Sequence, residues 1–211
     1  MKIFILWFLC LGFLPFSVAA DKLVFDVFLD DKKIGLHQVD ITSEDEHLHV
    51  TVKADMRVDV LFLNVFSYEH QAKEHWQNDC IAELETQTND DGDKLMVKGM
   101  AKPDGFEVVT QSSSKMLYDC VRTFAYWNPD LLSASYLLNT QNGLYEPASL
   151  SDRKAHSLDF NDRTFGNYHY RLSVGEDVVI DLWYDNADQW VALETEVANG
   201  RKLRYIRQEQ S

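Results

Sequence analysis

The chain has 211 residues and a formal net charge of −14 at neutral pH. This acidic balance argues against nucleic acid as a partner, because a phosphate backbone requires a basic footprint, and against electrostatic docking on anionic lipid. A chain of this length fits one domain with a sizeable core, and no linker or repeat divides it.

Residues 1–20 have the pattern of a cleavable secretory signal. Lys2 gives a positive start, residues 3–16 are almost wholly apolar, and residues 17–20 are small. The pattern predicts cleavage just before Asp21, which leaves residues 21–211 as a single β-rich domain. It also predicts export, so we expect the protein in the periplasm.

An alternation of apolar and polar residues follows at once and predicts β-strands. Residues 23–29 and 47–56 alternate, and the polar residues 30–33 are expected to turn the chain. The phase of the alternation changes near Gly35, which predicts a β-bulge there.

Residues 58–66 are mostly apolar and do not alternate. One interpretation is a strand that is buried on both faces. The other is a lip or lid over an apolar cavity, or a patch that touches membrane or a lipidic ligand.

One stretch in the middle of the chain has helical rather than alternating spacing. Asn128 can cap a helix that has Pro129 at its first position. Leu131, Ala134 and Leu138 would then lie on one side of it. The sequence therefore predicts a short helix from Pro129 to about Leu138.

The remaining elements are predicted strands with hairpin-length connections. They are expected at residues 65–76, 80–88, 94–100, 106–111, 168–174, 178–184 and 191–197. Asn199-Gly200 is a strong hairpin signal and leads to a last strand that carries Leu203 and Tyr205. About ten strands of this kind predict a mainly β protein: a single curved antiparallel meander, closed as a barrel or open as a half-barrel. The short helix around 129–138 could plug one mouth of it.

Two cysteines lie outside the signal segment, Cys80 and Cys120. An even count in an exported chain predicts one disulfide between them, and two buried free thiols are the alternative.

The densest polar and aromatic cluster lies around His70 and Glu74. On a strand these two residues share a face with Tyr68 and Trp76. A metal site would need a third ligand, and His37 is the one suggestive residue, so we expect a polar strip beside an aromatic pocket rather than a metal centre. No motif predicts a catalytic nucleophile or a phosphate-binding loop, and no cofactor is expected.

Several short strings together resemble a known family over almost the whole exported chain. They are residues 25–30, 34–37, 68–70, 74–76, 124–129, 137–143, 182–185 and 190–194. They are similar to an uncharacterised family of secreted Gram-negative bacterial proteins, a domain of unknown function. The resemblance implies an architecture like that of periplasmic proteins whose curved sheets hold lipids or lipoprotein tails, and it associates the family with genes of fatty-acyl modification. It implies no catalytic residues.

We therefore expect a non-catalytic periplasmic protein that binds an apolar or lipid-like molecule in the curve of its sheet. The expected lining residues are Phe62, Phe66, Tyr68, Tyr126, Trp127 and Trp183. His37, His70 and Glu74 are expected to orient a polar head. Transient membrane contact is compatible with this interpretation, and the oligomeric state stays open. The alternatives are an envelope enzyme that uses His70 and Glu74, and a scaffold that binds a protein through its acidic surface.

Overall fold

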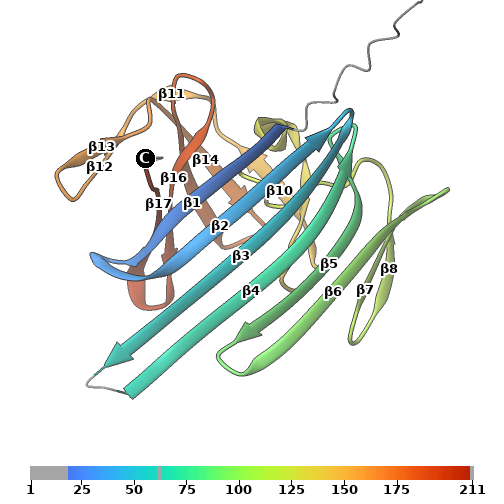
Figure 1. Cartoon of the computed structure of the whole chain (residues 1–211), viewed down its shortest axis with the longest axis horizontal. Coiled ribbons are helices and arrows are strands. Elements are labelled where there is room, and N and C mark those ends of the chain that lie inside the picture. The colour runs from blue at the N-terminus through green and yellow to red at the C-terminus, as the bar shows by residue number, and fades with distance from the viewer. Residues whose placement is uncertain (1–18, 61–62, 210–211) are drawn as a thin grey trace, which may run out of the picture.

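The computed structural model describes residues 19–60 and 63–209, and these form a strongly curved antiparallel sheet (Figure 1). The described strands are β1 (Ala19–Leu29), β2 (Lys32–Glu44), β3 (His47–Val60), β4 (Leu63–Gln77), β5 (Cys80–Asp90), β6 (Asp93–Lys102), β7 (Gly105–Thr110), β8 (Ser114–Leu117), β9 (Tyr136–Leu138), β10 (Tyr145–Leu150), β11 (Lys154–Ala155), β12 (Leu158–Phe160), β13 (Arg163–Phe165), β14 (Tyr168–Val174), β15 (Val178–Tyr184), β16 (Trp190–Val197) and β17 (Arg201–Arg207). Two short 3-10 turns, Pro129–Ser133 and Ala198–Gly200, complete the described elements.

The sheet consists of two meanders that join through the pairing of β1 with β17. Its strand order is β8-β7-β6-β5-β4-β3-β2-β1-β17-β16-β15-β14-β10-β9, with β11 paired to β14 as the fifteenth strand. The end strands β8 and β9 are not paired with each other among the described strands, so the sheet is not closed into a barrel. The predicted mainly β, curved antiparallel architecture is confirmed in its half-barrel form.

Alternation places the core on the concave side of the sheet. Phe25 and Val27 on β1 have no exposed surface, whereas Asp26 between them faces outward and pairs with Lys33. The predicted bulge is present: the register between β1 and β2 shifts after Val27, opposite Gly35. A side chain at Gly35 would collide with the carbonyl oxygen of Asp55 on β3, so only glycine allows the strands to approach here.

The beginning of β1 overlaps the predicted signal segment. β1 starts at Ala19, and Ala19 and Ala20 pair with Ser43 and Thr42 of β2. Cleavage before Asp21 would remove only these two pairs and would leave the rest of the ladder intact. The cleavage site stays a prediction, and residues 1–18 lie outside the described part of the chain.

The predicted helix from Pro129 to Leu138 is wrong in its extent. Asn128 does cap a helical turn, by accepting a hydrogen bond from the Asp130 N–H at 2.9 Å, but this turn is the 3-10 turn Pro129–Ser133. The chain is extended again by Ala134, and Leu138 pairs with Tyr145 as part of β9. Sheet pairing and burial of Leu137 and Leu138 therefore outweigh the helical spacing.

Segment 121–145, which contains this turn and β9, fills much of the concave side. Its residues Val121, Ala125 and Leu138 pack against the side chains of β3 to β8. Leu131 and Leu137 pack against those of β14 to β16. The role predicted for a short helix, a plug of the curved sheet, is thus taken by an irregular segment.

The predicted disulfide between Cys80 and Cys120 is confirmed. It joins the first residue of β5 to the residue before segment 121–145, with 5.1 Å between the two Cα atoms. The backbone N–H of Ile81 donates to the carbonyl of Val121 at 3.0 Å beside it. The bond therefore fixes the start of segment 121–145 to the sheet.

Reduction of this disulfide is expected to lower the free energy of unfolding by roughly 2–4 kcal/mol, because the unfolded chain regains the entropy of an open loop. Urea unfolding with and without dithiothreitol measures the change. The double variant Cys80→Ser/Cys120→Ser should match the reduced protein and should not respond to reductant. Equal unfolding midpoints for oxidised and reduced wild type would contradict a stabilising bond.

Candidate functional site

A chamber of about 240 Å³ lies on the concave side, between the sheet and segment 121–145. Its wall includes six of the nine predicted ligand-binding residues: His37, Tyr68, His70, Glu74, Tyr126 and Trp127. Strands β2 and β4 and segment 121–145 contribute them. Sequence positions that are up to 90 residues apart are therefore brought to one cavity, although their role in binding stays a prediction.

The chamber wall includes a row of cross-strand neighbours on β2, β3 and β4, and the row continues to Thr88 on β5, behind His70. His37 pairs with Ala54, Ala54 with His70, and His70 with Thr88. Because Ala54 has only a methyl side chain, it leaves open space between the two imidazole rings.

The two histidines differ in their hydrogen bonding. His70 Nδ1 lies 2.8 Å from the Thr88 hydroxyl, a distance that fits a hydrogen bond. His37 Nδ1 is buried and has no hydrogen-bond partner among the described residues. The ring of His37 instead meets the aromatic rings of Phe25, Trp190 and Tyr205 edge-on. A buried polar atom without a partner is rare in proteins and marks a position where a ligand group can bind.

Burial controls the charges in the chamber. It lowers the pKa of His37 and of His70 to about 4, and the nearby His70 adds to the effect on His37. Burial raises the pKa of Glu74 to about 7, against the opposing effect of the hydrogen bond that Glu74 accepts from the Trp76 indole at 2.7 Å. His37 keeps some accessible surface although protein surrounds it, because that surface faces the chamber rather than bulk water. Near neutral pH both imidazoles are therefore uncharged.

These shifts predict how stability depends on pH. The folded pKa of each histidine lies below the unfolded value of 6.5, so their contribution is complete above pH 6.5 and is lost as the pH falls toward 4. The folded pKa of Glu74 lies above its unfolded value of 4.5, so its contribution is complete below pH 4.5 and is lost as the pH rises through 7.

Between pH 6.5 and 5, acidification thus lowers the stability contributed by the two histidines and raises the stability contributed by Glu74. We expect the free energy of unfolding to fall by roughly 1.4 kcal/mol per pH unit on acidification, which corresponds to one net proton. Urea unfolding at several pH values measures this slope. The variant His70→Gln, which can keep the contact with Thr88, should make the slope nearly flat. An unchanged slope in that variant would show that His70 is not held neutral by burial.

A second, larger cavity of about 530 Å³ adjoins the chamber at the base of the β3–β4 hairpin. Its apolar wall includes Leu29, Ile34, Met56, Val58 and Phe66. We call this cavity the cleft. Its wall continues directly into that of the chamber, because four residues line both: Tyr68, Gln141, Leu203 and Tyr205.

Two of the four residues that line both cavities, Tyr68 and Gln141, are joined in a short chain of hydrogen bonds. The Tyr68 hydroxyl donates to Gln141 Oε1 at 3.2 Å, and Gln141 Nε2 donates to Asp90 Oδ2 at 3.2 Å. Both distances are at the long end for protein hydrogen bonds. Tyr68 and Gln141, together with Leu203 and Tyr205, therefore form the partition between the two cavities, and two weak side-chain hydrogen bonds hold Tyr68 and Gln141 in place.

The apolar run 58–66 does not form a strand buried on both faces, so that interpretation is wrong. β3 ends at Val60 and β4 begins at Leu63, and the two strands pair with Val60 opposite Leu63, so the described part of the run is divided between two strands. Val65 is 51% exposed, and the paired ends of β3 and β4 project from one end of the sheet in Figure 1. Val58 pairs with Phe66, and both line the cleft, as the interpretation of a lip over an apolar cavity requires. Phe62, another predicted lining residue, lies outside the described residues.

Trp183 does not line either cavity, which corrects its predicted place. On β15 the side chains of Leu182 and Tyr184 enter the interior core, so period-two alternation turns Trp183 to the outer face. There it packs against Phe160 and Phe165 of the small β12–β13 sheet, which covers it. β15 has apolar residues on both faces, and the sequence does not indicate which face is the concave one.

Trp190, Tyr205 and Gln141 are among the chamber-lining residues that the sequence analysis did not name as site candidates. Alternation along β16 and β17 places the side chains of Trp190 and Tyr205 in the interior, once the inner face of each strand is known. Gln141 lies in the loop after β9, and no sequence pattern marks it.

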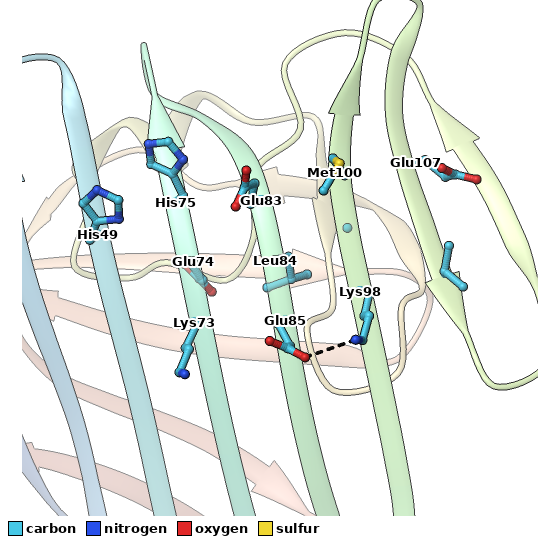
Figure 2. A pocket seen from close by; sticks show the side chains of 12 residues that line it. His49, Lys73, Glu74, His75, Glu83, Leu84, Glu85, Lys98, Met100 and Glu107 are labelled. Atoms are coloured by element: carbon cyan, nitrogen blue, oxygen red, sulfur yellow. Dashed lines mark ion pairs between the residues drawn. The ribbon is translucent and has the colours of Figure 1, made fainter.

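The outer face of β3 to β7 carries a shallow groove of about 430 Å³ (Figure 2). His49, His75, Glu83, Glu85 and Lys98 lie on this face, and Lys98 pairs with Glu85 at 3.2 Å. Figure 2 shows Glu74 and Leu84 on the opposite side of the same strands. Within residues 19–60 and 63–209, no group of three or more potential ligands has the geometry to hold a metal ion.

The fold and its cavities define a β-barrel-like protein whose open sheet curves around a partly hollow interior. The chain belongs to the family described as a domain of unknown function (DUF6134), which matches residues 25–208. A solved structure described as a beta-barrel-like protein of the domain of unknown function DUF1849 from Brucella abortus is similar in fold. The likeness covers 91% of this chain and 96% of that chain, with a TM-score of 0.62 and 9% identity. No curated protein matches the sequence. No described helix is long and apolar enough to cross a membrane.

Proposed function

We propose that this protein is a non-catalytic periplasmic carrier that binds an apolar or lipid-like molecule on the concave side of its sheet. The observation that carries the proposal is the adjoining pair of cavities, both with largely apolar walls, of which the chamber also gathers the buried polar side chains of His37, His70 and Glu74. Ligand sites typically combine an apolar wall with a few convergent polar groups, as His37, His70 and Glu74 provide here. The Cys80–Cys120 disulfide fits the oxidising compartment that the signal-like residues 1–20 predict.

The alternative of an enzyme that uses His70 and Glu74 has less support. The two side chains bond different partners, Thr88 and Trp76, and no interaction joins them to each other. A general acid and a general base need a shared reacting atom within hydrogen-bond reach. The scaffold alternative would be favoured by an interior filled with side chains. The chamber and the cleft are instead unfilled spaces among the described residues, so the scaffold also has less support.

The test is binding of a neutral fluorescent probe, N-phenyl-1-naphthylamine, to the exported protein after delipidation. We expect wild type to bind it at micromolar concentration. Phe66→Asp places an unpaired charge on the apolar wall of the cleft and should weaken binding about tenfold or more. Val109→Asp makes the same change on the outer face, where the side chain is exposed, and should bind like wild type.

Circular dichroism of both variants separates loss of binding from loss of folding. Native mass spectrometry of the protein from the periplasm of a Gram-negative host supplies an independent readout, because a carrier should retain a lipid there. A folded wild type that carries no lipid and binds no probe would reject the proposal.

A further inference from the structure

The two cavities differ in size and chemistry in a way that specifies the shape of the ligand. The chamber, at about 240 Å³, is smaller than the roughly 300–1,000 Å³ of most small-molecule sites, whereas the cleft, at about 530 Å³, lies within that range. The cleft alone, however, offers a mostly apolar wall. A molecule that uses both cavities needs one polar end and one apolar end.

The partition between the cavities allows such a molecule to span them. Tyr68 and Gln141 line both spaces, and side-chain rotation of these two residues would open a passage. The cost is the loss of two hydrogen bonds of 3.2 Å, and a polar ligand group could replace them. A cleft of about 530 Å³ suits a single acyl chain better than the paired chains of a diacyl lipid.

Between about pH 5 and pH 6.5 the head of the ligand would meet mostly uncharged partners, because burial lowers the pKa of His37 and of His70 to about 4 and raises that of Glu74 to about 7. No lysine or arginine is among the described residues that line the chamber, and its titratable groups are His37, His70, Glu74, Tyr68 and two further buried tyrosines. Arg201, which reaches the cleft, is already paired with Asp30 at 2.8 Å. In this pH range neither an anionic nor a cationic head would find a counter-charge in the chamber, and an unpaired buried charge is costly.

The surroundings of His37 indicate a ligand independently of the cavity volumes. Its imidazole is enclosed by Phe25, Trp190 and Tyr205, and its Nδ1 has no hydrogen-bond partner among the described residues. A hydroxyl, ester or amide head can give or accept a hydrogen bond at this ring without carrying a charge into the chamber.

We propose, on the basis of the carrier function above, that the ligand is a single-chain amphiphile with an uncharged, hydrogen-bonding head. The head lies in the chamber between His37 and His70, and the acyl chain passes Tyr68 and Gln141 into the cleft. The protein thereby selects against phosphate and quaternary ammonium heads.

Three probes with the same twelve-carbon chain test the selection: 1-lauroylglycerol, dodecyl phosphate and dodecyltrimethylammonium. Each displaces N-phenyl-1-naphthylamine from wild type below its micelle concentration and at pH 6, where Glu74 is mostly protonated and the two histidines are uncharged. We expect 1-lauroylglycerol to bind at least about tenfold more tightly than either charged probe. Equal or tighter binding of dodecyl phosphate or of dodecyltrimethylammonium would overturn the head-group proposal while the carrier function stands. Failure of all four molecules to bind would reject both.

The variant His37→Phe links the selection to the chamber. It keeps a flat ring and removes an imidazole whose Nδ1 has no hydrogen-bond partner among the described residues. We expect about a tenfold loss of 1-lauroylglycerol affinity and little change for N-phenyl-1-naphthylamine, which has no head to place. Equal losses for both molecules would mean that His37 acts only by packing, and no loss for either would place the head elsewhere. Both outcomes overturn this assignment.

Discussion

Replacement of Ala54 by phenylalanine is expected to weaken the binding of 1-lauroylglycerol by about 100-fold, which corresponds to roughly 2.7 kcal/mol. Ala54 lies between His37 and His70 in the chamber wall and points its methyl group into the open space. A phenyl ring at this position would occupy the place proposed for the ligand head.

The cost of this substitution in folding should be small. A larger side chain in a filled core costs roughly 1–3 kcal/mol, but here the ring enters a cavity that already exists. We therefore expect the free energy of unfolding of Ala54→Phe to lie close to that of wild type, or above it. This combination of retained stability and lost binding separates a ligand chamber from a packing defect.

Lys53→Phe is the matched control for Ala54→Phe. Lys53 is the preceding residue on β3, and its exposed side chain lies on the opposite face of the strand. The control should bind 1-lauroylglycerol like wild type. Isothermal titration at concentrations below the micelle limit measures all three proteins. A folded Ala54→Phe that binds as tightly as wild type would exclude the chamber as the place of the head.

The general architecture could be predicted from the sequence because alternation is a local property of each strand. Residues 23–29 and 178–184 both alternate, and both are strands of the curved sheet. Asn199-Gly200 predicts the last hairpin, and both residues adopt the left-handed conformation that its turn needs, with φ of 63° and 69°. Whether the sheet closes into a barrel depends on pairing between the end strands β8 and β9, and no local sequence pattern specifies that pairing.

The errors arose where tertiary contacts decide between two local solutions. Residues 129–138 have a helix cap and helical spacing, but pairing of β9 with β10 ends the helical turn at Ser133. Trp183 lies on a strand that is apolar on both faces, because the small β12–β13 sheet covers its outer face. Neither contact can be read from the residues that it affects.

The candidate site was predicted in part because its residues share one inner face. Tyr68, His70 and Glu74 alternate along β4, so one correct assignment of the inner face places all three in the chamber. The neighbours of His70 on other strands depend on register instead. The row of His37, Ala54, His70 and Thr88 results from the pairing of four strands. A shift of one residue in any pair would break this row.

Substitution of Trp190 by alanine is expected to cause a large loss of stability, roughly 3–5 kcal/mol. The side chain is 2% exposed, stacks on Phe25 with 3.9 Å between ring centroids, and donates its indole N–H to the Ala192 carbonyl at 2.9 Å. Removal of the indole would leave a void that opens into the chamber, because Trp190 forms part of the chamber wall. Urea unfolding at pH 7 measures the loss. A change below about 1 kcal/mol would contradict a packed core around Trp190.

A pair of phenylalanine variants separates the hydrogen bond from the packing. Trp183 is also buried, but its indole N–H has no hydrogen-bond partner among the described residues. Trp190→Phe breaks an existing bond and leaves a buried carbonyl with one donor fewer, whereas Trp183→Phe removes an N–H that was already unsatisfied. We expect Trp190→Phe to be the more destabilising by about 1 kcal/mol. Equal losses in the two variants would show that packing alone decides, and that the bond to Ala192 adds nothing to the stability of the wall that encloses the chamber.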